Sequence, residues 1–356
     1  MTGRKTPAAD RIRALVAAGL FLAIGPVMAA PSPSICASAG QAVREEGFVA
    51  LGGIEQWVTV KGADCANPVV LFLHGGPGNP LSPYADALYG AWEKDFTLVQ
   101  WDQRGAGRTF GRSPPGESAL SLERMAADGV ELAEHVTRRL GAKKVILLGG
   151  SWGSILGVRM ATARPDLFHA YVGVSQVVSY RDNSAASYAK ATALAKAAGD
   201  EKTMAALAAI GPPPWENPRN FGILRRAIRA YEAKSSDPAP KAWWAPAPGY
   251  DTRERLAETE EGEDYSYLQF VGRKGDGLFS KVDLAKQGAA FAIPVFLVHG
   301  AEDLVATPEV ARRYFDDITA PRKAFVLVPR AGHDPNPALV AAQYRVVMQQ
   351  ARPGAK

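Results

Sequence analysis

Residues 147–154 read LLGGSWGS, with one serine set among three glycines directly after an apolar run. Glycine costs conformational entropy and supplies no side chain to pack, so this cluster indicates a backbone that needs room. The segment matches the pattern G-x-S-x-G, in which a strand turns sharply into a helix and the serine occupies a strained corner. We expect Gly149 and Gly153 to relieve crowding at this corner, and Gly150 to help make the turn.

Apolar runs with the length and composition of buried strands recur on both sides of this corner. They cover residues 53–62, 69–73, 97–101, 144–149, 169–175 and 293–300, and a further run begins at residue 324. Helical spacing of apolar residues covers 122–140 and 152–163. Strands that are apolar throughout and separated by helices indicate an α/β fold with a mostly parallel sheet, covered on both faces.

The strand pattern stops between residues 179 and 290. That stretch is rich in Ala, Glu and Lys at helical spacing, and it is broken by GPPPWENPRN and DPAPKAWWAPAPG. We therefore predict a core in two segments, residues 43–178 and 291–356, interrupted by a helical insertion over residues 179–290.

The N-terminus has the pattern of an export signal. A basic region is followed by the 11-residue apolar run ALVAAGLFLAI, by Pro26 and by small residues near position 29. A helix that spans a membrane needs about 20 apolar residues. We predict a signal peptide over residues 1–29, a flexible tether over 30–42, no stable membrane anchor after cleavage, and a periplasmic or secreted location.

Charge and cysteine content narrow the range of partners. The formal net charge is +5, but residues 1–29 alone hold four basic residues and one acidic residue. The rest of the chain shows no basic stripe, so nucleic acid is not a predicted partner. An oxidising compartment permits a disulfide between Cys36 and Cys65, although two unpaired thiols fit the sequence equally.

Polar residues follow several of the predicted strands, and these ends meet at one edge of a parallel sheet, where ligands bind. A neutral serine hydroxyl needs a base to act as a nucleophile. For Ser151 we assign His333, in the polar loop PRAGHDPNP, as that base. Asp303, in HGAEDLVATP, is its acidic partner and Glu302 the alternative. His299 is interpreted as a packed residue that supports the loop.

An oxyanion formed by attack of the serine needs hydrogen-bond donors that are already in place. The backbone N–H of Trp152 is one candidate, and that of Gly76 in the turn HGGPG is the other. A phosphate-binding turn is the rival interpretation of HGGPG, but neither GxGxxG nor GxxxxGK[ST] is present. The predicted chemistry needs no metal or organic cofactor.

Five motifs in this order, HGGPG, WDQRGAGRT, GGSWGS, HGAEDLVATP and AGH, resemble the proline iminopeptidase (prolyl aminopeptidase) family of α/β-hydrolases. The resemblance implies an α/β-hydrolase fold with an inserted helical cap. It also implies Ser151, Asp303 and His333 as a catalytic triad, and HGGPG with Trp152 as the oxyanion hole. Thr109 stands where the family usually has serine, and we interpret Asp102 and Arg104 of this motif as structural.

The cap is where the resemblance gives least guidance. Family members that remove an N-terminal proline hold the substrate ammonium with cap carboxylates, and a desolvated cation needs such a partner. Glu216 and Glu232 are candidates, together with Glu258, Glu260, Glu261, Glu263 and Asp264. Cap aromatic residues that could line an apolar pocket, or simply pack the cap, are Trp215, Trp243, Trp244 and Tyr250.

The sequence therefore predicts an exported serine hydrolase that acts through an acyl-enzyme on a small-molecule or short-peptide substrate. The leading hypothesis is an aminopeptidase like proline iminopeptidase. A carboxylesterase or lactonase with the same triad is the second hypothesis, and a binding module without catalysis is the third. The sequence leaves the oligomeric state open.

Overall fold

The computed structural model describes residues 1–3, 35–36, 38, 40–115, 120–287 and 290–355. The chain divides into two units, Met1–Pro33 and Ser34–Lys356, and the fold belongs to the second. Apart from residues 1–3, the predicted signal peptide lies outside the described residues, as does much of the predicted tether. Within the described part of the chain, no helix is both long enough and apolar enough to cross a membrane.

Eight strands form a single sheet in the order β1-β2-β4-β3-β5-β6-β7-β8. They are β1 (Val43–Leu51), β2 (Ile54–Gly62), β3 (Val69–Leu73), β4 (Thr97–Trp101), β5 (Val145–Gly150), β6 (Phe168–Val174), β7 (Val295–Gly300) and β8 (Lys323–Val328). The β1–β2 and β2–β4 pairs are antiparallel, and every other pair is parallel.

Ten α-helices accompany these strands in the described residues. They are α1 (Ala85–Tyr89), α2 (Gly107–Arg112), α3 (Leu122–Leu140), α4 (Trp152–Ala163), α5 (Tyr180–Ala197), α6 (Glu201–Ile210), α7 (Arg219–Ser235), α8 (Arg253–Val271), α9 (Pro308–Asp317) and α10 (Pro337–Val346). Short 3-10 or π segments are η1 (Gly90–Trp92), η2 (Pro165–Leu167), η3 (Lys241–Trp244), η4 (Leu278–Lys281), η5 (Val347–Ala351) and η6 (Arg352–Gly354).

Alternate side chains of each central strand pack into two separate cores, because successive residues point to opposite faces of a sheet. On β5, Ile146 belongs to a core with α1 and α10, whereas Leu147 belongs to a core with α3, α4 and α9. Both residues are fully buried. The sheet is therefore covered on both faces, which explains why its strands read as apolar throughout.

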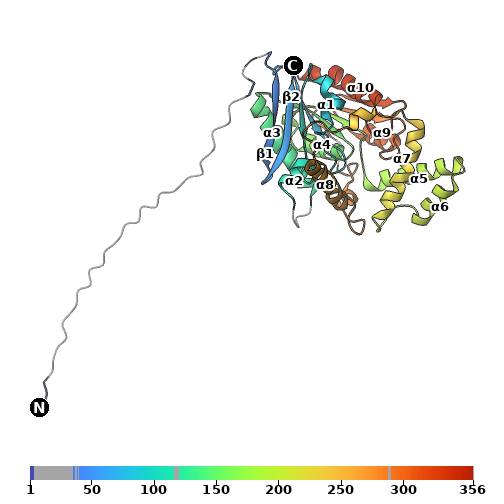
Figure 1. Cartoon of the computed structure of the whole chain (residues 1–356), viewed down its shortest axis with the longest axis horizontal. Coiled ribbons are helices and arrows are strands. Elements are labelled where there is room, and N and C mark those ends of the chain that lie inside the picture. Colours follow the sequence, from blue (N-terminus) through green and yellow to red (C-terminus); the bar gives the residue numbers. More distant parts are fainter. Residues whose placement is uncertain (4–34, 37, 39, 116–119, 288–289, 356) are drawn as a thin grey trace. The chain divides into compact units, whose positions relative to one another are not determined.

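Four helices, α5 to α8, follow β6 and precede β7 along the chain. Helices α5, α6 and α7 gather beyond one end of the sheet, and α8 lies beside α2 (Figure 1). The first three share a small core of their own, which includes Trp215 and Ile228 and reaches Leu304 in the loop after β7. We call α5 to α8 the cap.

The predicted fold class is confirmed: a mostly parallel α/β sheet lies between helices. Strand β1 was not predicted from the sequence. Its residues, VREEGFVAL, are half-exposed and include three charged side chains, so they form no apolar run. Cys36 and Cys65 are joined by a disulfide with their Cα atoms 5.4 Å apart, which resolves a pairing that the sequence left open.

Candidate active site

Ser151 occupies the corner between β5 and α4 in a strained backbone conformation. Its φ is 50° and its ψ is −117°, outside the regions that residues with a side chain normally adopt. The corner is held on both sides: the Ser151 N–H donates to Val174 O at 3.0 Å, and Ser154 Oγ–H donates to Ser151 O at 2.6 Å. Such strain persists only where the surroundings over-determine it, and it is common at functional sites.

Two of the three glycines in this stretch are required by close approach of backbone. A Cβ on Gly149 would lie 2.4 Å from Gly153 O, and a Cβ on Gly153 would lie 2.1 Å from Leu73 O. A Cβ on Gly150 would meet nothing within 4 Å, and its φ is outside the left-handed region. The expectation that Gly150 helps make the turn therefore has no steric basis in the structure.

Ser151, His333 and Asp303 form one chain of hydrogen bonds. His333 Nε2 lies 2.9 Å from Ser151 Oγ, and His333 Nδ1 lies 2.9 Å and 3.0 Å from the two carboxylate oxygens of Asp303. The carboxylate can only accept, so Nδ1 carries a proton and Nε2 faces the serine as an acceptor. This arrangement can take the proton from the serine hydroxyl.

Asp303 is held rigidly in the loop after β7 and is fully buried. Its Oδ1 accepts hydrogen bonds from the N–H groups of Val305 at 2.9 Å and Ala306 at 2.8 Å. Burial alone would raise the pKa of Asp303, but the charge of His333 and hydrogen bonds from His299 and His333 lower it far below its ordinary value. The group is therefore a carboxylate at neutral pH.

His299 lies behind this carboxylate at the end of β7. Its Nε2 lies 3.4 Å from Asp303 Oδ2 and within hydrogen-bond distance of Ala306 O, and its ring stacks on Phe325. Its contacts are those of a residue that supports the loop.

The pKa of His333 reflects opposing influences. Burial lowers the pKa, but the charge of Asp303 and the hydrogen bond to it prevail, and the pKa is raised above its ordinary value. Arg225 on α7 acts in the lowering direction and Asp334 in the raising direction. His333 can therefore hold a transferred proton more strongly than a free imidazole does.

The two backbone groups expected to stabilise an oxyanion lie in segments that meet at Ser151. Trp152 is the first residue of α4, and the N–H groups of a first helical turn have no acceptor within the helix. Gly76 has a φ of +107°, and a Cβ there would lie 2.7 Å from Gly78 N. A Cβ on Gly75 would lie 3.4 Å from the Cβ of Ser151, so this turn passes close to the serine.

Gln103 connects these two segments, although no pattern in the sequence singles it out. Its side-chain oxygen accepts from Trp152 Nε1–H at 3.0 Å, and its side-chain nitrogen donates to His74 O at 3.1 Å. Its own backbone N–H donates to His74 Nε2 at 3.1 Å. All three residues are buried. Gln103 thereby sets the position of the HGGPG turn relative to α4.

His74 is a neutral structural histidine in this network. Because its Nε2 accepts from Gln103, its Nδ1 carries the proton and donates to Gly75 O at 2.8 Å. Burial lowers its pKa to about 4, so it remains neutral at physiological pH. A neutral ring keeps both hydrogen bonds and fixes the start of the turn.

The rest of the WDQRGAGRT motif is used for structure. Asp102 is buried and accepts from Ser82 Oγ and from the Arg108 N–H, and burial raises its pKa to about 7. Thr109 Oγ1 donates to Asp102 O at 2.5 Å and accepts from the Trp57 N–H at 2.8 Å. A hydroxyl at position 109 meets both needs, so threonine serves as well as serine would.

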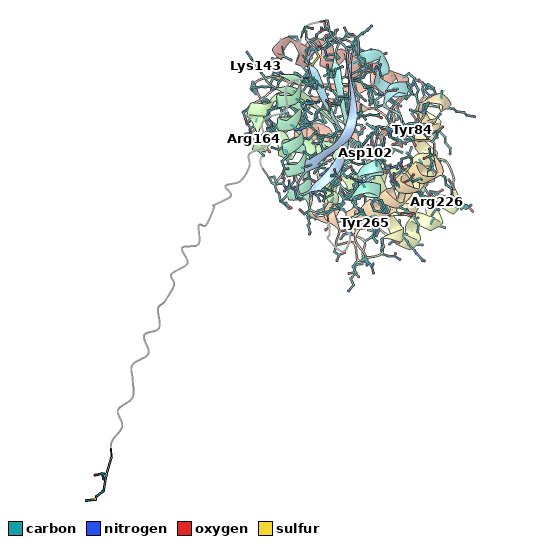
Figure 2. The ribbon with its side chains drawn as sticks, turned by 60° about the vertical axis from the view of Figure 1, so that its left-hand side comes forward. Tyr84, Asp102, Lys143, Arg164, Arg226 and Tyr265 are labelled. Carbon is teal, nitrogen blue, oxygen red and sulfur yellow. A yellow bond between two sulfur atoms is a disulfide. The ribbon has the colours of Figure 1, made fainter. Side chains whose placement is uncertain are left out.

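Arg104 of the same motif points away from the serine. It pairs with Asp128 on α3 at 2.8 Å and donates to Gly52 O at 2.8 Å. Asp102 directly follows β4, whereas Tyr84 and Arg226 lie on the side of the molecule that carries the cap (Figure 2).

Two cavities meet at Ser151. One has a volume of about 380 Å³ and includes Trp152, and the other has a volume of about 340 Å³ and includes His333. Both are lined by Gly76 and Ser151 from the core, and by charged cap residues. The charged cap residues common to both are Arg225, Arg229 and Glu263.

The two cap glutamates named from the sequence lie elsewhere. Glu232 is 7% exposed, and its Oε1 accepts from the Leu304 N–H at 2.6 Å, directly beside Asp303. It lines a third cavity, of about 380 Å³, together with His333. Glu216 is exposed and lines none of these three cavities.

Glu232 is also unusual in its ionisation. Burial and the charge of Asp303 raise its pKa to about 7, although His333 and the Leu304 N–H act against that rise. A cap carboxyl that titrates near neutrality is therefore in contact with the loop that holds Asp303.

Comparison with known proteins agrees with this fold. A family model described as the alpha/beta hydrolase fold matches residues 68–337. The chain belongs to the alpha/beta hydrolase fold family. This hydrolase is 26% identical over 302 residues to a probable aminopeptidase, YbaC, of Bacillus subtilis (strain 168), which covers 81% of this chain and 90% of the relative.

Two further comparisons concern proteins named for the predicted activity. The alpha/beta hydrolase is 27% identical over 289 residues to a probable proline iminopeptidase of Streptomyces coelicolor, covering 76% of this chain and 84% of that protein. The crystal structure of a Mycobacterium smegmatis proline iminopeptidase superposes with a TM-score of 0.59 at 21% identity, covering 86% of this chain and 97% of that one, and shows the shared fold. The resemblance drawn from the five motifs is confirmed.

Proposed function

We propose that this hydrolase is an exported aminopeptidase that removes the N-terminal residue, proline in particular, from short peptides. Its curated relatives are named as aminopeptidases, which supports the reaction class. The observation that carries the choice of a peptide substrate is an acidic cap residue that lines the same cavities as the serine.

That residue is Glu263 on α8. Of the seven cap carboxylates considered in the sequence, it alone lines both cavities that contain Ser151. No ion pair engages its carboxylate within the described part of the chain. Its α8 backbone packs on the oxyanion turn, because a Cβ on Gly78 would lie 2.9 Å from Glu263 Cα. Burial raises the pKa of Tyr84, which lines one of these cavities, and the charge of Glu263 raises it further.

A carboxylate that lines the serine's cavities and has no ion-pair partner among the described residues suits the free ammonium of a peptide. The interaction is attractive only where the substrate is charged at its N-terminus, so it selects peptides over neutral acyl compounds. This role matches the cap carboxylates implied by the family resemblance.

The proposed reaction is a two-step acyl transfer. Ser151 Oγ bonds to the substrate carbonyl carbon while its proton passes to His333 Nε2, and Asp303 stabilises the imidazolium. The N–H groups of Gly76 and Trp152 hold the oxyanion. The C–N bond then breaks, and the leaving amine takes the proton from His333. Water repeats the sequence on the acyl-enzyme, releasing the amino acid and restoring the serine.

Export is supported by two features of the N-terminal region. The basic and apolar pattern of residues 1–29 is typical of a signal peptide. The Cys36–Cys65 disulfide fits an oxidising compartment. Mass spectrometry of the mature N-terminus from a cell fractionation tests this part: a chain that begins near residue 30 supports it, and an intact cytoplasmic chain overturns it.

The substrate class is tested by comparing proline β-naphthylamide with p-nitrophenyl acetate. We expect Glu263→Gln to lower the ratio of kcat/KM for the naphthylamide to that for the ester by about tenfold or more. Glu261→Gln, an exposed neighbour on α8 outside both cavities, should keep the wild-type ratio. A wild type that cleaves the ester but no aminoacyl amide would favour the carboxylesterase or lactonase hypothesis.

A further inference from the structure

Two arginines of the cap line the same two cavities as Glu263. Arg225 and Arg229 are four residues apart on α7, so their side chains lie on the same face of the helix. Both line both cavities that contain Ser151. Arg225 is half-buried, whereas Arg229 is exposed.

Among the described residues, neither guanidinium forms an ion pair. The ion pairs found among the described residues use arginines elsewhere, for example Arg255 with Glu258 on α8 and Arg330 with Asp237. None joins Arg225 or Arg229 to Glu263, although all three line the same cavities. Groups of opposite charge therefore line one binding space without pairing with each other.

The positive charge of Arg225 affects the pKa of His333. His333 has a raised pKa because Asp303 outweighs burial, and Arg225 opposes that rise. An anion bound by Arg225 would therefore lie within electrostatic range of His333. In the described residues, the acidic groups lining these two cavities are Glu263 and, in one of them, Asp334. The first cavity thus carries an excess of positive charge, because Arg226 lines it as well.

We propose that Arg225 and Arg229 bind a carboxylate on the leaving part of the substrate. This inference rests on the proposed aminopeptidase function and specifies its substrates as short zwitterionic peptides. Glu263 would hold the ammonium at one end, and the arginine pair would hold the carboxylate at the other. Guanidinium groups suit this task because their planar N–H donors match the two oxygens of a carboxylate.

The carboxylate can come from the C-terminus of a dipeptide or from an acidic side chain after the cleaved bond. The C-terminus confines activity to very short peptides, whereas an acidic side chain permits longer ones. Three substrates separate the two sources: Pro-Gly, which has a free C-terminus, Pro-Gly amide, which has no carboxylate, and Pro-Glu amide, which has only the side-chain carboxylate.

The test is kcat/KM for these three substrates with wild type, Arg225→Gln/Arg229→Gln and Arg219→Gln. Arg219 begins the same helix, is exposed and lines neither cavity, so it is the matched control. We expect wild type and control to prefer Pro-Gly over its amide by about tenfold or more, and the double variant to lose that preference. The ratio within one preparation is independent of the folded fraction.

If wild type cleaves Pro-Glu amide rapidly, the result supports the arginine pair and assigns the side chain as the source of the carboxylate. If wild type cleaves Pro-Gly rapidly but Pro-Glu amide slowly, the result assigns the C-terminus. Equal rates for all three substrates with wild type, or a preference for the substrates that carry a carboxylate that survives in the double variant, would overturn the inference alone. Hydrolysis of p-nitrophenyl acetate with none of the three peptides cleaved would overturn the aminopeptidase function itself.

Discussion

His333 Nε2 lies 2.9 Å from Ser151 Oγ, a contact between residues 182 positions apart in the sequence. It exists because β5 and β8 belong to one sheet, which continues across the cap insertion through the β6–β7 pair. The strands of the core therefore bring the two residues together, and the cap lies over the site that they form.

The pH profile tests the pairing of His333 with Asp303. The base must be neutral, and its folded pKa is raised, so kcat/KM should fall as the pH drops through a midpoint above 6.5. Asp303→Asn should move this midpoint down, because the main influence that opposes burial is removed, and should lower kcat on the order of 10⁴-fold. Asp316→Asn, an exposed acid on α9, serves as the control. An unmoved midpoint in Asp303→Asn would contradict the pairing.

Gln103 is predicted to position the oxyanion hole. Gln103→Leu leaves the Trp152 indole N–H and the His74 carbonyl without their partners, and we expect kcat to fall about 10- to 100-fold with little change in KM. Donors aimed at the oxyanion act mainly in the transition state, which explains the effect on kcat. Gln100→Met removes a buried amide whose nitrogen has no partner in the described structure, and should change kcat less than twofold. A rise in KM alone would refute this role.

The glycines of the corner should differ in their tolerance of alanine. Gly149→Ala drives a Cβ into the backbone at Gly153, so the free energy of unfolding should fall by roughly 3 kcal/mol or more. Gly150→Ala enters open space and should change it by less than about 1 kcal/mol. Urea denaturation of both variants measures the difference, and equal losses would show that crowding is not the constraint.

Glu232 should make stability depend on pH in a predictable direction. The pKa of Glu232 in the folded state is about 7, above the ordinary 4.5. Ionised Glu232 therefore destabilises the folded state, and this destabilisation is absent below pH 4.5, grows between pH 4.5 and 7, and is complete above pH 7. Glu232→Gln keeps the acceptor for the Leu304 N–H and should gain stability relative to wild type, by up to about 3 kcal/mol at pH 8. The gain should vanish at pH 4.

Glu216→Gln is the matched control for that experiment, because Glu216 is an exposed cap glutamate. Its difference from wild type should be the same at pH 4 and pH 8. A Glu232→Gln variant whose stability changes with pH as the wild type does would contradict the role assigned to burial.

The sequence was most informative where backbone constraint and motif coincide. The β5–α4 corner could be predicted because close packing leaves no room for a side chain at Gly149 or Gly153. The positions of His333 and Asp303 could be predicted because both follow strands whose carboxyl ends share one edge of the sheet. The catalytic roles of these residues stay predictions. Strand β1 could not be predicted, because its half-exposed residues show no apolar run.

The cap was beyond prediction for a different reason. Six of the seven acidic residues lie in helical patterns and look alike in the sequence, whereas the structure distinguishes Glu263 because it alone of the seven lines both cavities. Gln103 was missed likewise, because its partners, His74 and Trp152, belong to separate motifs.

The central claim is that Ser151 is the nucleophile of an aminopeptidase. The most direct measurement is turnover of proline β-naphthylamide by wild type and Ser151→Ala, purified in parallel and shown to be equally folded. We predict that wild type cleaves the substrate and that Ser151→Ala loses activity by on the order of 10⁴-fold or more. Turnover by Ser151→Ala near the wild-type rate would contradict the account.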